Sequence, residues 1–578
     1  MAAQNASEDD IKQFAINVCI VINFQPEYAC KMLGNSLWGE AWFMLQRTTY
    51  GSELICGSFI NNCGPDYNPI DEPWQVEIPG NKPPVQPWPN PKGEAWFMLQ
   101  RTTYGSELIC GSFVNNCGPD YNPIDEPWQV EIPGNKPPVQ PWPNPKPNSP
   151  TLRVLHLSDI HIDRWYTVGS EADCSNGLPM NTYIYCCRNY TDNSDTYIRD
   201  FIKVPAGKWG SPYRCDIPFI TFDNAMKHIA NNEKFDYILM TGDLSNHAVW
   251  DYTKEAHFDN INNITAVLKN YFPNTLIIQA IGNHEAVPCD SMAPHTMEQY
   301  DTRGPQAIYN LLSKSWINWL PYSIEENMQY RASYSFRPFE GIKYISINSI
   351  YCSRDNFYLY INLTDPDYTL QWLVQELNDS ESRGEKVHII GHISSGASCL
   401  KAWSQNYYKI VNRYESTIAA QFFGHTHQDE FEIYYENMDP NGRPTSMVYM
   451  TPSLTTSSYN FPAYRIYTID GNYSGSSWTV LDIENYYANI TEANLNDQEP
   501  IWRLEYTAKS TYKMPDLSPT SWDNLTKNFL QENELFESFY KFYDRQQKDP
   551  SSCDATCKMS LVCALRTAES KAGKKYCL

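Results

Sequence analysis

Five short hydrophobic runs punctuate the middle of the chain, at residues 154–157, 237–240, 276–281, 387–390 and 419–423. Each run is rich in β-branched or aromatic residues and too short for an ordinary helix, which predicts buried strands. Segments that we interpret as helices lie between the runs, as at residues 222–231 and 367–378. Because strands that alternate with helices are typical of α/β folds, we predict an α/β domain over residues 151–470.

The residues that follow these runs are ones that can bind a metal. They form the segments Ser158-Asp159-Ile160-His161, Gly242-Asp243, Gly282-Asn283-His284-Glu285, Gly391-His392 and Gly424-His425-Thr426-His427. Ligands converge at the carboxyl ends of strands in layered α/β folds, and glycine allows the chain to turn sharply there. Carboxylate, imidazole and amide oxygen together suit zinc, manganese or iron better than calcium. One such segment alone is usually only a turn, whereas the ordered set predicts a single dinuclear metal centre.

The chain on either side of the α/β domain has a different character. Residues 11–64 are interpreted as helical, and residues 39–92 recur as residues 93–146 with one change, Ile60 to Val114. Two near-identical copies indicate a duplicated exon or an assembly error more than a solenoid. Each copy ends in a proline-rich stretch that we expect to be an extended, stiff spacer. Residues 520–547 predict a helix that docks on the α/β domain, because its polar face carries charges of both signs; a membrane-binding amphipathic helix is the alternative.

Charge and cysteine content narrow the class of protein. The formal net charge of −23 argues against a nucleic-acid binder, which would need a basic patch. The chain has 17 cysteines, and Cys553, Cys557, Cys563 and Cys577 cluster near its end, which favours the oxidising secretory pathway. Eight Asn-x-Ser/Thr sequons add weak support. The polar start of the chain lacks the pattern of a signal peptide, and we therefore expect an incomplete N-terminus.

The order of the five segments resembles the calcineurin-like metallophosphoesterases. The resemblance implies an αββα sandwich with two metal ions, Asp159, His161 and His427 on one and Asn283, His392 and His425 on the other, bridged by Asp243. Purple acid phosphatases have a tyrosine ligand three residues after the Gly-Asp aspartate, where this chain has Asn246. A redox-active iron is therefore disfavoured, and the resemblance implies two zinc ions.

Further segments resemble the acid sphingomyelinases. They are Lys386-Val387-His388-Ile389-Ile390-Gly391-His392, Arg413-Tyr414-Glu415 and Ile469-Asp470-Gly471-Asn472-Tyr473-Ser474-Gly475-Ser476-Ser477. The resemblance implies a partial saposin-like domain at residues 1–72, a linker at 73–150 that contains the duplication, a catalytic domain at 151–470 and a helical, disulfide-bearing region at 471–578. It also implies disulfides Cys19–Cys30, Cys174–Cys186, Cys187–Cys215, Cys352–Cys399, Cys553–Cys557 and Cys563–Cys577, with Cys289 left over. Cys110 and Cys117 could replace saposin cysteines that the chain lacks.

The resemblance implies hydrolysis of sphingomyelin in membranes or lipoproteins, with a histidine protonating the leaving ceramide oxygen. His284 is the first candidate and His247 the second, which could instead orient a ligand. We expect a lysosomal or secreted monomer that touches membranes through the saposin-like segment. The alternatives are a phosphodiesterase acting on nucleotides or other soluble phosphodiesters, and an inactive lipid-binding protein.

Overall fold

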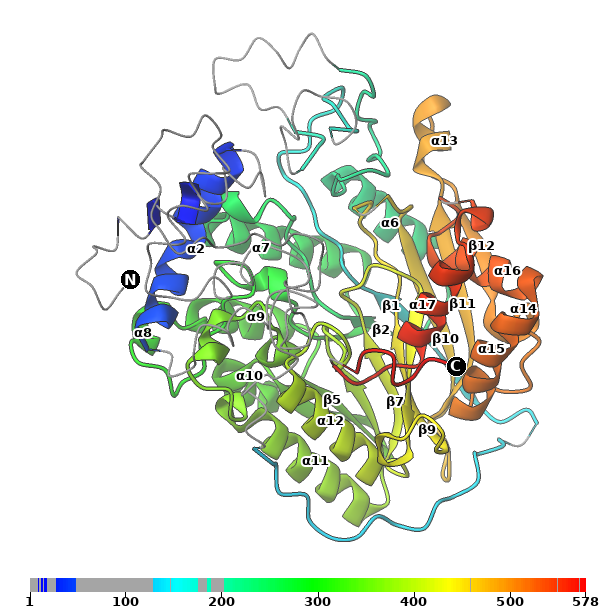
Figure 1. The fold of residues 1–578 in the computed structure, drawn as a ribbon. Coiled ribbons are helices and arrows are strands. Elements are labelled where there is room, and N and C mark those ends of the chain that lie inside the picture. Colours follow the sequence, from blue (N-terminus) through cyan, green and yellow to red (C-terminus); the bar gives the residue numbers. More distant parts are fainter. Residues whose placement is uncertain are drawn as a thin grey trace, which may run out of the picture.

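The computed structural model describes residues 9, 12–13, 15–17, 27–47, 128–145, 147–174, 185–188, 202–457, 459–547, 549–570 and 572–578. Two six-stranded sheets form the centre of the molecule (Figure 1). The expected saposin-like domain is therefore described mainly by one helix, α2 (Glu27–Arg47), and the linker from residue 128 onward. The pairing of Cys110 and Cys117 lies outside the described residues.

The first sheet has the order β12-β11-β10-β1-β2-β3. Its members are β1 (Thr151–Leu157), β2 (Tyr237–Met240), β3 (Leu276–Gln279), β10 (Ala463–Asp470), β11 (Val480–Ala488) and β12 (Trp502–Thr507). Strands β1, β2 and β3 are parallel, whereas β10 runs antiparallel to β1, with Thr151 opposite Asp470. The ends of β1, β2 and β3 therefore meet at one edge.

The second sheet has the order β4-β5-β6-β7-β9-β8. Its members are β4 (Tyr334–Phe339), β5 (Ile342–Ser346), β6 (Lys386–Ile390), β7 (Ile418–Phe423), β8 (Glu430–Tyr435) and β9 (Pro444–Met450). Strands β5, β6, β7 and β9 are parallel. The two sheets face each other across a shared core, where the His156 ring of β1 packs edge-on against Phe422 of β7 and the Tyr237 ring of β2 packs edge-on against Tyr344 of β5.

Helices cover both outer faces, which completes the expected αββα sandwich. On the first sheet lie α6 (Phe219–Asn232), α7 (Lys254–Tyr271) and α9 (Gln306–Trp316), and on the second α11 (Thr369–Arg383) and α12 (Lys401–Arg413). The smaller helices are α8 (Tyr300–Arg303), α10 (Glu325–Arg331), α13 (Ile490–Leu495) and α14 (Ala508–Thr511). Among the described residues, no helix is long and apolar enough to cross a membrane.

The C-terminal region differs from the expected helical appendage. It contains α15 (Pro519–Gln531), α16 (Asn533–Tyr543) and α17 (Ala555–Leu565), but it also supplies β11 and β12 to the first sheet. The boundary expected at residue 470 thus falls between two hydrogen-bonded strands. The single helix expected at 520–547 is two helices, α15 and α16, because Glu532 has an extended backbone.

The disulfides agree with the implied pairing wherever the structure describes both partners. The bonds are Cys174–Cys186, Cys187–Cys215, Cys352–Cys399, Cys553–Cys557 and Cys563–Cys577. Cys30 is also disulfide-bonded, while its expected partner Cys19 lies outside the described residues. Cys289 is a buried free thiol, as expected.

Candidate metal centre

Each predicted ligand follows the end of a strand. Asp159 and His161 follow β1, Asp243 follows β2, Asn283 follows β3, His392 follows β6, and His425 and His427 follow β7. Except for His425, which is partly exposed, all of them are buried. The two sheets therefore contribute to one site from both sides, and the structure brings all the predicted ligands together.

Asp243 lies at the centre of the group. Its Oδ2 is 2.9 Å from Nε2 of His392 and 3.4 Å from Nε2 of His161. On the side of His161, the Nε2 atoms of His161 and His427 are 3.2 Å apart, and Asp159 Oδ1 is 3.4 Å from His427 Nε2. On the other side, ligand atoms of Asp243, His392 and His425 lie within 4.8 Å of one another. The group thus contains two clusters that share Asp243.

The backbone holds several ligands in an uncommon conformation. Asp159, His161, Asp243, His425 and His427 have φ between 42° and 74°, the left-handed region that few residues other than glycine adopt. Such residues persist only where the surrounding structure fixes them, and they cluster at functional sites. Here the Asp159 carboxylate accepts the His425 N–H at 3.0 Å, and the His161 N–H donates to the Asp243 carbonyl at 3.0 Å.

Hydrogen bonds leave the correct atoms available for a metal. The Nδ1 atoms of His161 and His392 lie 2.6 Å from the carbonyls of Ser245 and Thr241, so each ring carries its proton on Nδ1 and presents Nε2. The Asn283 amide nitrogen is 3.5 Å from Asp290, whereas its buried Oδ1 has no hydrogen-bond partner among the described residues. A buried oxygen without a partner is costly, and a bound cation would satisfy it.

The ionisation of the site also fits a cation. Burial opposes the charged form of Asp243, but the nearby charges of His392 and His284 hold its pKa well below the usual range. Burial likewise opposes protonation of His161 and His392, but Asp243 raises the pKa of His161 to about 9 and that of His392 to about 10. The carboxylate therefore attracts positive charge, which a divalent ion would supply in place of protons.

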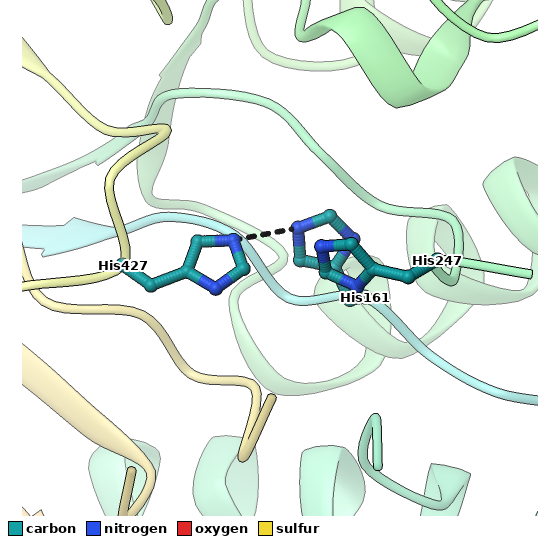
Figure 2. A group of neighbouring side chains, drawn as sticks. All are labelled: His161, His247 and His427. Atoms are coloured by element: carbon teal, nitrogen blue, oxygen red, sulfur yellow. Dashed lines mark hydrogen bonds between the residues drawn. The ribbon is translucent and has the colours of Figure 1, made fainter. Parts of the chain in front are cut away.

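Both candidate acids lie beside the His161 side of the centre. The rings of His161 and His247 stack with centroids 3.9 Å apart, and Figure 2 shows His427 approaching the same pair. Asp216 is buried, and its carboxylate lies 2.9 Å from His247 Nδ1. His284 instead has neutral partners on Nδ1, the Tyr252 hydroxyl at 2.6 Å and the Asn246 carbonyl at 3.1 Å. Burial lowers the pKa of His284 well below its usual range.

Three residues that support the site had no role assigned from the sequence. Glu285 accepts the backbone N–H groups of Gly282, Asp243 and Leu244 at 2.6, 3.0 and 2.7 Å, which fixes the turns after β2 and β3. Its place beside Asn283 and His284 was a signal that could have found it. Asp216 and Tyr252 lie in no motif, and only the fold brings them to His247 and His284.

Comparison with known proteins agrees with this geometry. Residues 152–429 match the calcineurin-like phosphoesterase family, and residues 444–577 match the acid sphingomyelin phosphodiesterase C-terminal region. Sphingomyelin phosphodiesterase 2 of Caenorhabditis elegans is 49% identical over 99% of this chain and 85% of its own length. The chain belongs to the sphingomyelin phosphodiesterase family. Membership in this metallophosphoesterase family implies a divalent metal centre, and the donors described above fit one.

Other relatives show the range of this family. The human sphingomyelin phosphodiesterase is 39% identical over 72% of this chain and 64% of its own length. A human cyclic GMP-AMP phosphodiesterase is 26% identical over 75% of this chain and 91% of its own length. The relatives thus include a protein named for a nucleotide phosphodiester as well as proteins named for sphingomyelin.

Proposed function

We propose that the protein hydrolyses sphingomyelin to ceramide and phosphocholine with two zinc ions. The observation that carries the proposal is the convergence of the predicted ligands on Asp243 in a chain whose similar relatives bear the name sphingomyelin phosphodiesterase. Carboxylate, imidazole and amide donors fit zinc. The position where purple acid phosphatases have a tyrosine ligand is occupied by Asn246, whose side-chain oxygen accepts the Ala248 N–H.

In this proposal Asp159, His161 and His427 hold one ion, Asn283, His392 and His425 hold the other, and Asp243 touches both. The separation of the two histidine groups on either side of Asp243 supports this division. When bound, two divalent ions would neutralise the phosphodiester charge and activate the attacking water.

The leaving ceramide oxygen needs a proton as the bond from phosphorus to that oxygen breaks and the bond to the water oxygen forms. The hydrogen bonds favour His247 for this step, although the sequence put His284 first. A buried carboxylate on Nδ1 stabilises an imidazolium, and His247 has Asp216 there, whereas His284 has only neutral partners. His284 then positions His247, whose ring it meets edge-on with centroids 4.7 Å apart.

The test combines metal content and turnover of purified full-length protein. We expect about two zinc ions per chain and hydrolysis of micellar sphingomyelin. His427→Ala should lose metal and lower kcat at least about 100-fold. His228→Ala, on the surface of α6, is the matched control and should change neither. His247→Ala and His284→Ala should lower kcat with the metal retained. A wild-type protein with full metal content and no turnover would support the inactive lipid-binding alternative.

The second candidate function is hydrolysis of a soluble nucleotide phosphodiester. The relative named cyclic GMP-AMP phosphodiesterase is the observation that favours it. Parallel assays with micellar sphingomyelin and a cyclic dinucleotide separate the two, and a higher kcat/KM for the nucleotide would overturn the first proposal.

We also propose that the chain is a monomer of the lysosome or the extracellular space and that the saposin-like segment contacts membranes. The disulfides support an oxidising compartment, and the docking of α2 on the catalytic domain keeps that segment near the site. Mass measurement of the native protein and its distribution between medium and lysosomes would test this.

A further inference from the structure

A lobe beside the metal centre exposes apolar side chains to solvent. The contact lobe consists of residues 163–174, 185–188 and 202–217. Within it Trp165 is 66% exposed, Val168 60% and Ile202 41%. Scattered exposed aliphatic residues are ordinary, but an exposed tryptophan within a small lobe that also carries two exposed aliphatic residues is typical of an interaction surface.

The contact lobe is firmly held, so these side chains have fixed supports. Gly169 and Ala172 donate backbone hydrogen bonds to Ala206 and Val204, both at 2.8 Å. The disulfides Cys174–Cys186 and Cys187–Cys215 connect its three segments. Asp163 and Arg188 form a buried two-point ion pair, at 2.7 and 2.8 Å, and Asp163 also accepts the backbone N–H of Trp165 at 2.9 Å.

The charge of the contact lobe is opposite to that of the whole chain. The chain has a net charge of −23, yet the exposed charged residues of the described lobe are Arg164, Lys203, Lys208 and Arg214. Three of the four acidic residues in the described lobe are buried: Asp163 is paired with Arg188, Glu171 accepts backbone N–H groups and Asp216 accepts the His247 N–H, while Asp173 is partly exposed. Cations beside exposed tryptophan and aliphatic side chains match the headgroup region of an anionic bilayer.

The contact lobe is also in the right place. Trp165 comes four residues after His161, and Tyr185 of the lobe stacks on His247 with centroids 5.6 Å apart. On its other side, Met32 of α2 packs against the cluster of Tyr185, Ala248 and Trp250. In Figure 1 the lobe lies along the upper edge, between α2 and α13. The contact lobe therefore lies between the saposin-like helix and His247, whose ring stacks on His161 of the metal centre.

We propose that the contact lobe is a second membrane-binding surface, in which Trp165, Val168 and Ile202 enter the interface of an anionic bilayer. The proposal rests on the proposed function, since a lipid substrate requires the site to approach the bilayer. It adds a membrane contact within the catalytic domain itself, next to the metals, to the one expected from the saposin-like segment.

The first test measures binding of the full-length protein to vesicles of sphingomyelin, phosphatidylcholine and phosphatidylserine by cosedimentation. The triple variant Trp165→Ser, Val168→Ser and Ile202→Ser should bind about tenfold more weakly or worse, because apolar area no longer leaves water. Tyr322→Ser with Tyr368→Ser is the matched control, since these side chains are 74% and 64% exposed beside α10 and α11, away from the lobe. Vesicle binding of the triple variant equal to wild type would overturn the proposal.

The second test separates the charge contribution. Lys203→Gln and Lys208→Gln should each weaken binding about fivefold on anionic vesicles and leave binding to neutral vesicles unchanged. This pair is informative even if the triple variant does not fold. If both lysine variants bind anionic vesicles as tightly as the wild type, the charge contribution is overturned. If the variants keep vesicle binding but lose a dimer in light scattering, the surface binds a second copy of the chain and the proposal is overturned.

Hydrolysis is measured separately from binding. Turnover of micellar sphingomyelin by the wild type tests the proposed function, and the ratio of vesicle to micelle turnover tests the contact lobe. A wild type that binds vesicles through the lobe but hydrolyses no sphingomyelin would refute the proposed function alone. Normal vesicle binding and normal turnover by the triple variant would refute the role of the contact lobe in membrane binding, and would leave the proposed function intact.

Discussion

At the scale of single residues, the site also contains side chains that are not predicted ligands but that hold the candidate catalytic histidines in place. Asp216 is the clearest case. Its carboxylate receives the His247 backbone N–H at 2.7 Å and the Thr455 hydroxyl at 2.8 Å, and it faces the His247 ring. Burial opposes ionisation of Asp216, but the charge of His247 holds its pKa below the usual range. Asp216 is thus a positioning residue for His247.

The substitution Asp216→Asn tests this role. The amide keeps the shape but removes the charge that stabilises protonated His247, so kcat should fall about 100-fold while metal content stays near two per chain. Asp259→Asn, an exposed residue of α7, is the control. A normal kcat in Asp216→Asn would show that Asp216 only supports the fold.

The sequence predicted this set of candidate ligands because each of them follows a strand in a recognisable segment. The same reasoning could not find Asp216, which has no neighbouring motif and reaches His247 only through the packing of residues 202–217 against the turn after β2. Nor could it weigh the hydrogen-bond partners of His284 and His247, because these partners come from distant parts of the chain.

At the scale of elements, the site requires the turns after β2 and β3 to pass very close together. Gly242 has φ of 86°, and a Cβ there would lie 2.4 Å from the Gly282 nitrogen. Backbone cannot yield as a flexible side chain does, so the turns that carry Asp243 and Asn283 would have to separate. Gly242 therefore allows the two turns to pack closely against each other, in addition to the sharp turn that the sequence predicted.

We expect Gly242→Ala to destabilise the protein by about 2 to 4 kcal/mol and to lower metal content. The matched control is Gly475→Ala, where φ is 85° and nothing lies within 4 Å of an added Cβ. Both substitutions carry the same backbone strain, and only the first has the clash. Thermal unfolding and metal analysis of the pair measure the difference, and equal losses in both variants would contradict the role of close approach.

The strands near the site were predictable because their runs are short, apolar and bounded by polar turns. The predicted 237–240 coincides with β2 (Tyr237–Met240), and the predicted 387–390 lies within β6 (Lys386–Ile390). Strands β11 and β12 were missed because exposed positions interrupt their apolar patterns: β12, at the edge of the first sheet, exposes Leu504, and β11, next to it, mixes buried with partly exposed residues. Their partners are fixed by tertiary packing and not by local pattern.

At the scale of the whole molecule, buried acids make stability depend on pH. Glu432 on β8 is 8% exposed; its Oε1 accepts the Ser394 hydroxyl at 3.0 Å, and its Oε2 has no partner among the described residues. Burial raises the pKa of Glu432 to about 8. The folded state therefore retains a proton that the unfolded chain loses near its ordinary pKa, and the associated stability is complete below about pH 4.3 and lost as pH rises towards 8.

Glu432→Gln should flatten this dependence. Over the window from about pH 4.5 to 8 the slope of the unfolding free energy should change by up to one proton, about 1.4 kcal/mol per pH unit. Denaturant unfolding at several pH values measures it, with Glu534→Gln on the exposed face of α16 as control. The same slope in wild type and Glu432→Gln would refute the assignment. A protein stabilised in this way suits an acidic compartment.

The central position of β1 has a consequence for how the protein is made. Strand β1 pairs with β10, with Thr151 opposite Asp470, and the carbonyl of Asp159 accepts the N–H of Thr455. During synthesis, the ribosome must therefore add about three hundred residues before β1 and its ligands find these partners. The described disulfides span at most 47 residues and can therefore close earlier. Local disulfides can thus constrain the nascent chain long before the residues of the metal site come together. During this interval the edge of β1 that will pair with β10 is open, and chaperones would have to protect it.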